Sequence, residues 1–265
     1  SDLQTDGTSA GTRQVQDIFA GVPASNPQHL TNVNGVLYFA AADGVHGVEL
    51  WRSDGTPAGT WIVKDIAPGA TGSNPAELVN VGGTLYFVAT DPVHGRELWA
   101  SDGTAGGTAI FKDVWSGAAS SSPHSLTVAG SRLFFVAEDA VSGLELWSTD
   151  GTAGGTALVK DIAAGSLPSY ADELTAVGDL LFFQADDMSA FGGELWVSDG
   201  TASGTVMVKD IFPGDQGSYP SQLTNVGGVL FFVADDGPHG CELWRSDGTP
   251  DGTFLVRDIN EQVGV

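Results

Sequence analysis

One short string recurs along this chain and constrains its fold more than any other feature. Five copies of the pattern ELWxxDGT begin at Glu49, Glu97, Glu145, Glu194 and Glu242. A truncated copy, Thr5 to Thr8, lies near the start. The aspartates of the six copies, Asp6, Asp54, Asp102, Asp150, Asp199 and Asp247, are 48 or 49 residues apart. A fixed period of this length is the signature of a fold made by stacking one supersecondary unit.

Each repeat predicts four short strands, because apolar and β-branched runs alternate with Gly, Asn, Asp and Pro. In the first complete repeat we expect strands A to D at Leu30–Val33, Val36–Ala41, Val48–Ser53 and Gly59–Ile66. The middle of strand B is apolar at every position, which is typical of a strand buried on both faces. Such a sheet needs a neighbour on each side.

The sequence therefore predicts an all-β fold, a five-bladed β-propeller of four-stranded antiparallel blades. We expect one domain, 1–265, with blades at about 29–66, 77–114, 125–162, 173–211 and 222–259. A β-helical solenoid is the weaker alternative, because its coils would be shorter and its tight hairpins fewer. Residues 1–20 add an outer, D-type strand (Gly11–Ile18) without A, B or C strands of its own. The last blade already has a D strand, so we expect one of the two to close the ring, and the other to fray, displace it or pair with another molecule.

The net charge of −23, from 33 acidic and 10 basic residues, restricts the partners. A field of this sign repels nucleic acids, anionic membranes and acidic polysaccharides. No apolar run is long enough to span a membrane. The single cysteine, Cys241, excludes a disulfide framework. Neutral glycans, cations and basic protein surfaces remain as partners.

The residues that recur in every repeat predict structural roles. The Asp-Gly-Thr-x-x-Gly-Thr segment between strands C and D indicates turn chemistry, with a metal-binding loop as the alternative. If Ser53 faces Thr60 across this hairpin, the register pairs Glu49 with Lys64, each pair contributing ~0.2–1 kcal/mol. It also pairs Glu97 with Lys112, Glu145 with Lys160, Glu194 with Lys209 and Glu242 with Arg257. The tryptophans are expected to fill the wedges between blades, rather than stack on sugars; they are Trp51, Trp99, Trp147, Trp196 and Trp244.

Candidate ligand-binding residues lie where the B-to-C loops and the D-to-A linkers share one rim, because variable loops on a rigid scaffold tend to carry binding. The loop candidates are Asp43, His46, Asp91, His94, Asp139, Asp187, Asp236 and His239, and the linker candidates are Trp115, Tyr170 and Tyr219. Carboxylates, imidazoles and aromatic rings together suit a neutral glycan. The structural alternative is that each Asp caps a turn and each His packs on the neighbouring tryptophan. Calcium is a third option, but one Asp per loop supplies too few oxygens without linker carbonyls.

An enzyme is not expected. Glycosidases use two carboxylates with unlike roles, whereas here the acids recur identically, and no nucleophile, zinc or phosphate-binding motif is present.

The ELWxxDGT string resembles the bacterial repeat family named for that motif, and the resemblance covers essentially the whole chain. It implies a secreted or surface-attached protein. The Ser53–Thr56 turn is also similar to the Asp-box hairpins of sialidase-type propellers, with different spacing and no catalytic residue carried over. Blade number and size are similar to those of the tachylectin-type lectins, which hold amino sugars between blades; this likeness is architectural only. We expect a multivalent lectin-like module, or alternatively a protein-interaction or surface-adhesion scaffold stabilised by calcium.

Overall fold

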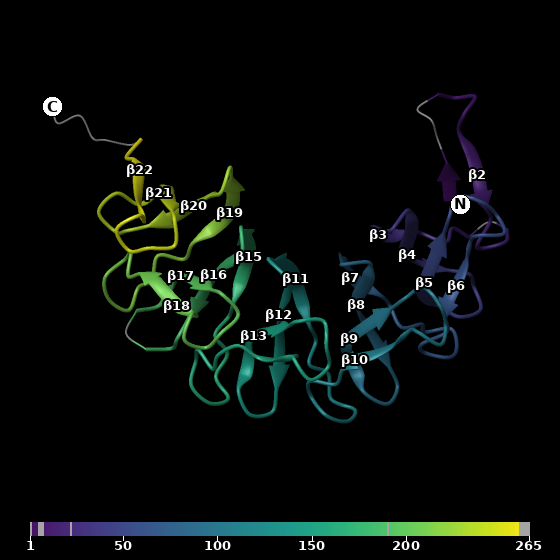
Figure 1. Cartoon of the computed structure of the whole chain (residues 1–265), viewed down its shortest axis with the longest axis horizontal. Helices are drawn as coiled ribbons and strands as arrows, with labels where there is room; N and C mark the ends of the chain where they lie inside the picture. The colour runs from purple at the N-terminus through teal and green to yellow at the C-terminus, as the bar shows by residue number, and fades with distance from the viewer. Residues whose placement is uncertain (1, 5–7, 22, 190, 260–265) are drawn as a thin grey trace. The chain divides into compact units, whose positions relative to one another are not determined.

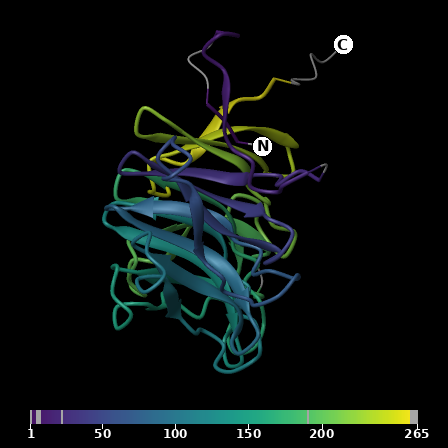
Figure 2. The same cartoon turned by 90° about the vertical axis from the view of Figure 1, so that its right-hand side faces the viewer.

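The computed structural model describes residues 2–4, 8–21, 23–189 and 191–259, and its fold is all-β. Five four-stranded antiparallel sheets follow one another in repeats of about 48 residues, which confirms the predicted five-bladed propeller. The strands of each sheet lie in chain order (Figure 1). Figure 2 shows the twisted strands of the N-terminal repeats running side by side. The chain divides into two compact units, 1–124 and 125–265.

The strand bounds agree closely with the predicted ones. The first blade has β3 (Gln28–Val33), β4 (Val36–Ala42), β5 (Val48–Ser53) and β6 (Trp61–Lys64), and the second has β7 (Ala76–Val81), β8 (Thr84–Asp91), β9 (Gly95–Ser101) and β10 (Ala109–Lys112). The third has β11 (His124–Ala129), β12 (Arg132–Asp139), β13 (Gly143–Thr149) and β14 (Ala157–Leu158). The fourth has β15 (Asp172–Val177), β16 (Leu180–Asp186), β17 (Gly193–Ser198) and β18 (Val206–Lys209). The fifth has β19 (Ser221–Val226), β20 (Val229–Asp235), β21 (Cys241–Ser246) and β22 (Phe254–Arg257).

The N-terminal strand pair has the register of a C–D hairpin. In it, β1 (Asp2–Gln4) pairs with β2 (Arg13–Gln16), and Leu3 faces Gln14 as Trp51 faces Ile62 in the first blade. The prediction that this D-type strand has no strand C is therefore wrong. The reason is that residues 2–4 lack the apolar pattern of the other C strands. The expected copy of the turn at Asp6 lies outside the described residues.

The N-terminal D-type strand packs on the first blade, and the last blade keeps its own D strand, β22, in its sheet. Ile18 is buried in a cluster with Phe39, Ala41 and Trp51. With its amide nitrogen oriented toward acceptors, Gln16 donates to the carbonyl of Thr60 at 3.0 Å. β2 therefore contacts the first blade as a preceding blade would.

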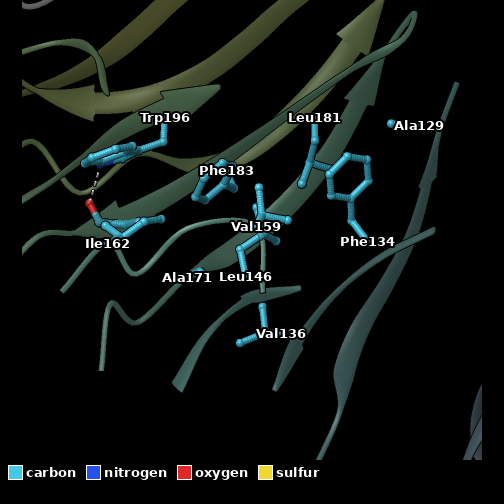
Figure 3. Close-up of a cluster of buried hydrophobic side chains, with 11 residues drawn as sticks. Ala129, Phe134, Val136, Leu146, Val159, Ile162, Ala171, Leu181, Phe183 and Trp196 are labelled. Carbon is cyan, nitrogen blue, oxygen red and sulfur yellow. Dashed lines mark hydrogen bonds between the residues drawn. The ribbon is translucent and has the colours of Figure 1, made fainter. Parts of the chain in front are cut away.

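The apolar core lies between successive sheets within each unit. In the first unit, Trp99 of strand C packs with Leu50 and Val63 of the preceding blade. In the second unit, Trp196 and Phe183 pack in the same way with Val159, Leu146 and Ile162 (Figure 3). Each of the five tryptophans is no more than 7% exposed. The tryptophans of these clusters therefore fill the space between blades, as predicted. Because the rings are buried, they are not open to stack on a sugar.

The C–D turns are built from side-chain hydrogen bonds. Oδ1 of Asp54 accepts from the main-chain N–H of Thr56 at 2.9 Å and from its Oγ1 at 2.7 Å. These two bonds lower the pKa of Asp54. A Cβ at Gly59 would collide with this carboxylate, so the second glycine of the turn is required. The same bonds recur at Asp102, Asp150, Asp199 and Asp247.

The predicted Glu–Lys pairs are wrong, although the register near the turn is right. Ser53 contacts Thr60 at 2.7 Å and Trp51 faces Ile62, but a bulge then places Lys64 opposite Leu50. The bulge turns Val63 into the core against the next sheet. Lys112, Lys209 and Arg257 likewise face a leucine and not a glutamate.

The lysines instead connect one blade to the next. Lys64 donates from Nζ to the Thr108 carbonyl at 2.7 Å and lies 6.0 Å from the Trp99 ring centroid. Lys160 and Lys209 make the same bond to the carbonyls of Thr205 and Thr253. The recurring cation therefore holds the C–D turn of the following repeat.

Trp99→Ala is predicted to lower the free energy of unfolding by about 3–5 kcal/mol, because the ring fills the space between two sheets. Trp61→Ala is the matched control: this ring is 41% exposed and stacks on Arg52, so its loss should cost about 1 kcal/mol. Chemical denaturation followed by circular dichroism measures both. Equal losses for the two variants would contradict the wedge role.

Candidate functional site

The repeated glutamate holds the D-to-A linker at the rim. Glu49 is fully buried at the start of β5, and its Oε1 accepts from the main-chain N–H groups of Ala67 and Ser73, each at 3.0 Å. Ser73 Oγ donates to Oε2. Glu97 and Glu194 bind Ser121 and Ser218 in the same way. The role predicted for these carboxylates, a partner for lysine, is replaced by that of a linker clamp.

The third repeat departs from this arrangement. There the Ser169 hydroxyl donates to the carbonyl of Leu144 at 3.2 Å, and Glu145 Oε2 has no hydrogen-bond partner among the described residues. Pro168 stands where the first repeat has Gly72, and proline restricts the backbone around it. Burial raises the pKa of Glu145 to about 7.

The structure brings the predicted Asp and His of three B-to-C loops together. Asp43 Oδ1 accepts from the N–H groups of Val45 and His46, both at 2.8 Å, and Oδ2 lies 2.6 Å from the imidazole Nδ1. The pairs Asp91–His94 and Asp236–His239 have the corresponding separations of 2.8 and 2.7 Å. Each carboxylate is thus occupied by its own loop. The aspartate thus caps its own turn, as the structural alternative expects, and the packing of the imidazoles on tryptophan stays a prediction.

In each pair, the aspartate and the histidine each favour the charged form of the other. The hydrogen bond to Asp43 raises the pKa of His46, and His94 and His239 are raised by their aspartates in the same way. Burial raises the pKa of Asp43, but the N–H groups and imidazole outweigh it, so the net pKa is lowered.

The two remaining loops have no imidazole. Asp139 accepts from the N–H groups of Val141 and Ser142, and Asp187 accepts from the N–H and hydroxyl of Ser189. No group of three or more His, Cys, Asp or Glu side chains within the described residues is arranged to hold a metal ion.

A pocket of about 430 Å³ lies in the first unit, where linker residues meet the rim ends of strands B and C. Its lining combines polar linker side chains with small apolar residues. It is lined by Ser25, Asn26, Gln28, His29, Ala40, Ala42, Val48, Asn74, Pro75, Ala76 and Arg96.

A second pocket, of about 280 Å³, lies in the other unit and shares six lining positions of the repeat with the first. Ser218, Tyr219 and Cys241 correspond to Ser25, Asn26 and Val48 of the first pocket. The full lining is Phe212, Gln216, Gly217, Ser218, Tyr219, Ser221, Val233, Ala234, Asp235 and Cys241. The repeat thus forms a pocket at an equivalent place in each unit.

Strained backbone marks the pocket walls. The residue after the linker serine has φ between 43° and 50° in all five repeats, at Asn26, Asn74, Ser122, Tyr170 and Tyr219. The second residue of strand A has φ between 55° and 58°, at His29, Glu77, Ser125, Glu173 and Gln222. Left-handed φ values at non-glycine residues cost of order 1 kcal/mol each and cluster at functional sites. Four of them line the two pockets: Asn26, His29, Asn74 and Tyr219.

The predicted site residues are only partly at these pockets. Tyr219 lines the second pocket and is 61% exposed. The Asp–His loops line neither pocket, Tyr170 is exposed, and Trp115 is half-buried. The sequence analysis did not single out the linker residues Asn26, Gln28 and Asn74 or the arginine Arg96, which line the first pocket. The sequence did carry one signal for these linkers. A serine, such as Ser25 or Ser73, recurs eight residues after the aspartate that follows each D strand.

Comparisons with known proteins show the fold alone. No protein-family model and no curated protein matches the sequence. Oligopeptidase B from Leishmania major is 12% identical, over 95% of this chain and 36% of that chain, with a TM-score of 0.54. A prolyl endopeptidase is 8% identical, over 88% of this chain and 36% of that chain, also with a TM-score of 0.54. Puromycin hydrolase is 13% identical, over 92% of this chain and 40% of that chain, with a TM-score of 0.48.

The chain thus spans well under half the length of these three proteins. Its fold is similar to that of part of oligopeptidase B and part of a prolyl endopeptidase. Among the described residues, no helix has the length and apolar character needed to cross a membrane.

The His46, His94 and His239 imidazoles are predicted to titrate above the ordinary histidine pKa of about 6.5. Asp43→Asn should return His46 toward that value and leave His94 unchanged, because each pair lies within one loop. NMR titration of the imidazole carbon-bound protons measures this. A His46 pKa that does not change in the variant would show that the hydrogen bond is absent in solution.

Glu145→Gln is predicted to reduce the loss of stability between pH 5 and pH 8. The carboxyl keeps its proton in the fold up to about pH 7 but loses it near pH 4.3 when unfolded, so its contribution falls as the pH rises through this window. Thermal melts of the wild type and the variant at each pH give the difference. Asp54→Asn is the control, since an aspartate with a lowered pKa is ionised throughout this range. A stability difference between the wild type and Glu145→Gln that does not depend on pH would contradict the raised pKa.

Proposed function

We propose that this chain is a non-enzymatic, multivalent carbohydrate-binding module that holds neutral glycans in the linker pockets of its rim. The observation that carries the proposal is that two pockets, one in each unit, share six lining positions of the repeat. Two equivalent weak sites on one chain gain avidity on a dense glycan surface.

The pocket chemistry supports a glycan. The first pocket is lined by the amide-bearing residues Asn26 and Gln28 together with the small apolar residues Ala40 and Ala42, and this combination suits the hydroxyl groups and apolar face of a sugar. In the second, the exposed Tyr219 ring stands beside Ser218 and Asp235, so it is available to stack on a sugar. Strained backbone holds Asn26 and Tyr219 at the wall before a ligand arrives.

The acidic residues support a binding role over a catalytic one. The clamp glutamates recur at the same position of each repeat, and the loop aspartates accept hydrogen bonds from their own loops. We place the chain with the secreted or cell-surface bacterial proteins of the ELWxxDGT repeat family, on the strength of its five copies. Its charge of −23 favours neutral glycans over nucleic acid.

A glycan array with and without a calcium chelator tests the proposal. We expect binding of neutral glycans that chelator leaves unchanged. Tyr219→Ala should weaken binding at the second pocket roughly fivefold, the equivalent of about 1 kcal/mol of aromatic contact. Val45→Ala, on an exposed loop outside both pockets, is the matched control.

A lack of glycan binding together with a melting temperature that chelator lowers would overturn the proposal in favour of a calcium-stabilised protein-interaction or adhesion scaffold. Turnover of a glycoside that is lost on changing a single rim aspartate would instead show an enzyme.

A further inference from the structure

The first pocket differs from the second in carrying a guanidinium. Arg96 is the one lining residue with a permanent charge, and no Asp or Glu of the described chain lines this pocket. The other repeats have Val48, Leu144, Gly193 and Cys241 at the position of Arg96. The cation is therefore a feature of one site and not part of the repeat.

Arg96 is held in place by its neighbours. Its main-chain N–H donates to Ser120 Oγ at 2.9 Å, and its Nη1 donates to the carbonyl of Asn74 at 3.2 Å. The second bond fixes the planar head against the linker that forms the pocket wall. A guanidinium held in this way presents its remaining donors in a fixed orientation.

The surroundings of Arg96 compensate its charge only in part. Burial lowers the pKa of the guanidinium, and the carboxylate of Glu77 opposes this effect without cancelling it. A partly buried cation gains from a carboxylate that approaches with two oxygens, because such bonds are charge-assisted and paired.

We propose that the first pocket selects a sugar that carries a carboxylate, a uronic-acid residue, and that Arg96 binds this group. The proposal rests on the glycan-binding function above and names the ligand class of one site. The carboxylate takes the two-pronged position on the guanidinium, and the amides of Asn26 and Gln28 face the hydroxyl groups. The second pocket, with Asp235 in its wall and no basic residue among its described lining, remains a site for neutral sugars.

The overall negative charge limits the ligand to one or a few carboxylates. A polyanion meets the field of all 33 acidic residues, whereas a single uronic acid meets mainly the local guanidinium. The inferred ligand is therefore an isolated acidic sugar within a mostly neutral glycan.

Isothermal titration with methyl glucuronide and methyl glucoside, which differ in the carboxylate, tests the inference. We expect the glucuronide to bind the first pocket at least about tenfold more tightly, as a charge-assisted pair implies. Arg96→Gln should abolish the preference, and Arg96→Lys should restore part of it, since lysine keeps the charge but not the fork. Arg132→Gln, in the other unit, is the matched control. NMR shifts of the Asn26 and Gln28 amides locate the binding independently of the variants.

The other outcomes are separable. Glucoside binding without a preference for glucuronide overturns the inference and leaves the proposed function standing. A preference that survives Arg96→Gln while Asn26 and Gln28 do not shift also overturns it. Acetate that binds as tightly as glucuronide would overturn it too, because it would show a carboxylate site without sugar recognition. Absence of binding by any sugar removes the proposed function and the inference together.

Discussion

A buried carboxylate at the start of strand C fixes the part of each repeat that forms the rim. Glu49 and its counterparts are removed from water, so their oxygens require donors, and the donors come from the linker to the next strand A. The linker serine is thereby placed beside the end of strand B, where its carbonyl accepts from the next blade, as Ser73 does from Thr90. The left-handed residue that follows this serine lines a pocket at Asn74 and at Tyr219.

Successive sheets are joined by a second set of repeated contacts. Tryptophan and strand D residues fill the space between sheets, and the lysine of strand D reaches the turn of the next repeat. The bulge that directs Val63 inward also aims Lys64 at Thr108. A single irregularity in strand pairing thus serves both the apolar and the polar contacts between blades. The N-terminal strand pair uses the same interface, with Gln16 in the place of the lysine.

The sequence was sufficient for the fold but not for the site. The period, the turn residues and the apolar B strands predicted the four strands of the first blade to within two residues at each end, because each rests on local patterns. The predicted Glu49–Lys64 pair is wrong because of a bulge in strand D. Ile62 and Val63 are both apolar, so the alternation of polar and apolar residues gives no sign of this bulge. The pockets were missed because their side chains vary, from Asn26 to Tyr219, while the backbone position is constant. The recurrence of residues such as Asp43 and His46 predicted a ligand site at the loops, but these side chains hydrogen-bond to each other.

The most direct measurement is a crystal structure of the chain with a bound oligosaccharide that is neutral apart from one uronic-acid residue. The account predicts sugar in the linker pockets of both units, against Asn26 in the first and the Tyr219 ring in the second. Sugar bound only at the Asp–His loops, or on a surface without equivalent repeat positions, would contradict the claim that the repeat builds the binding site.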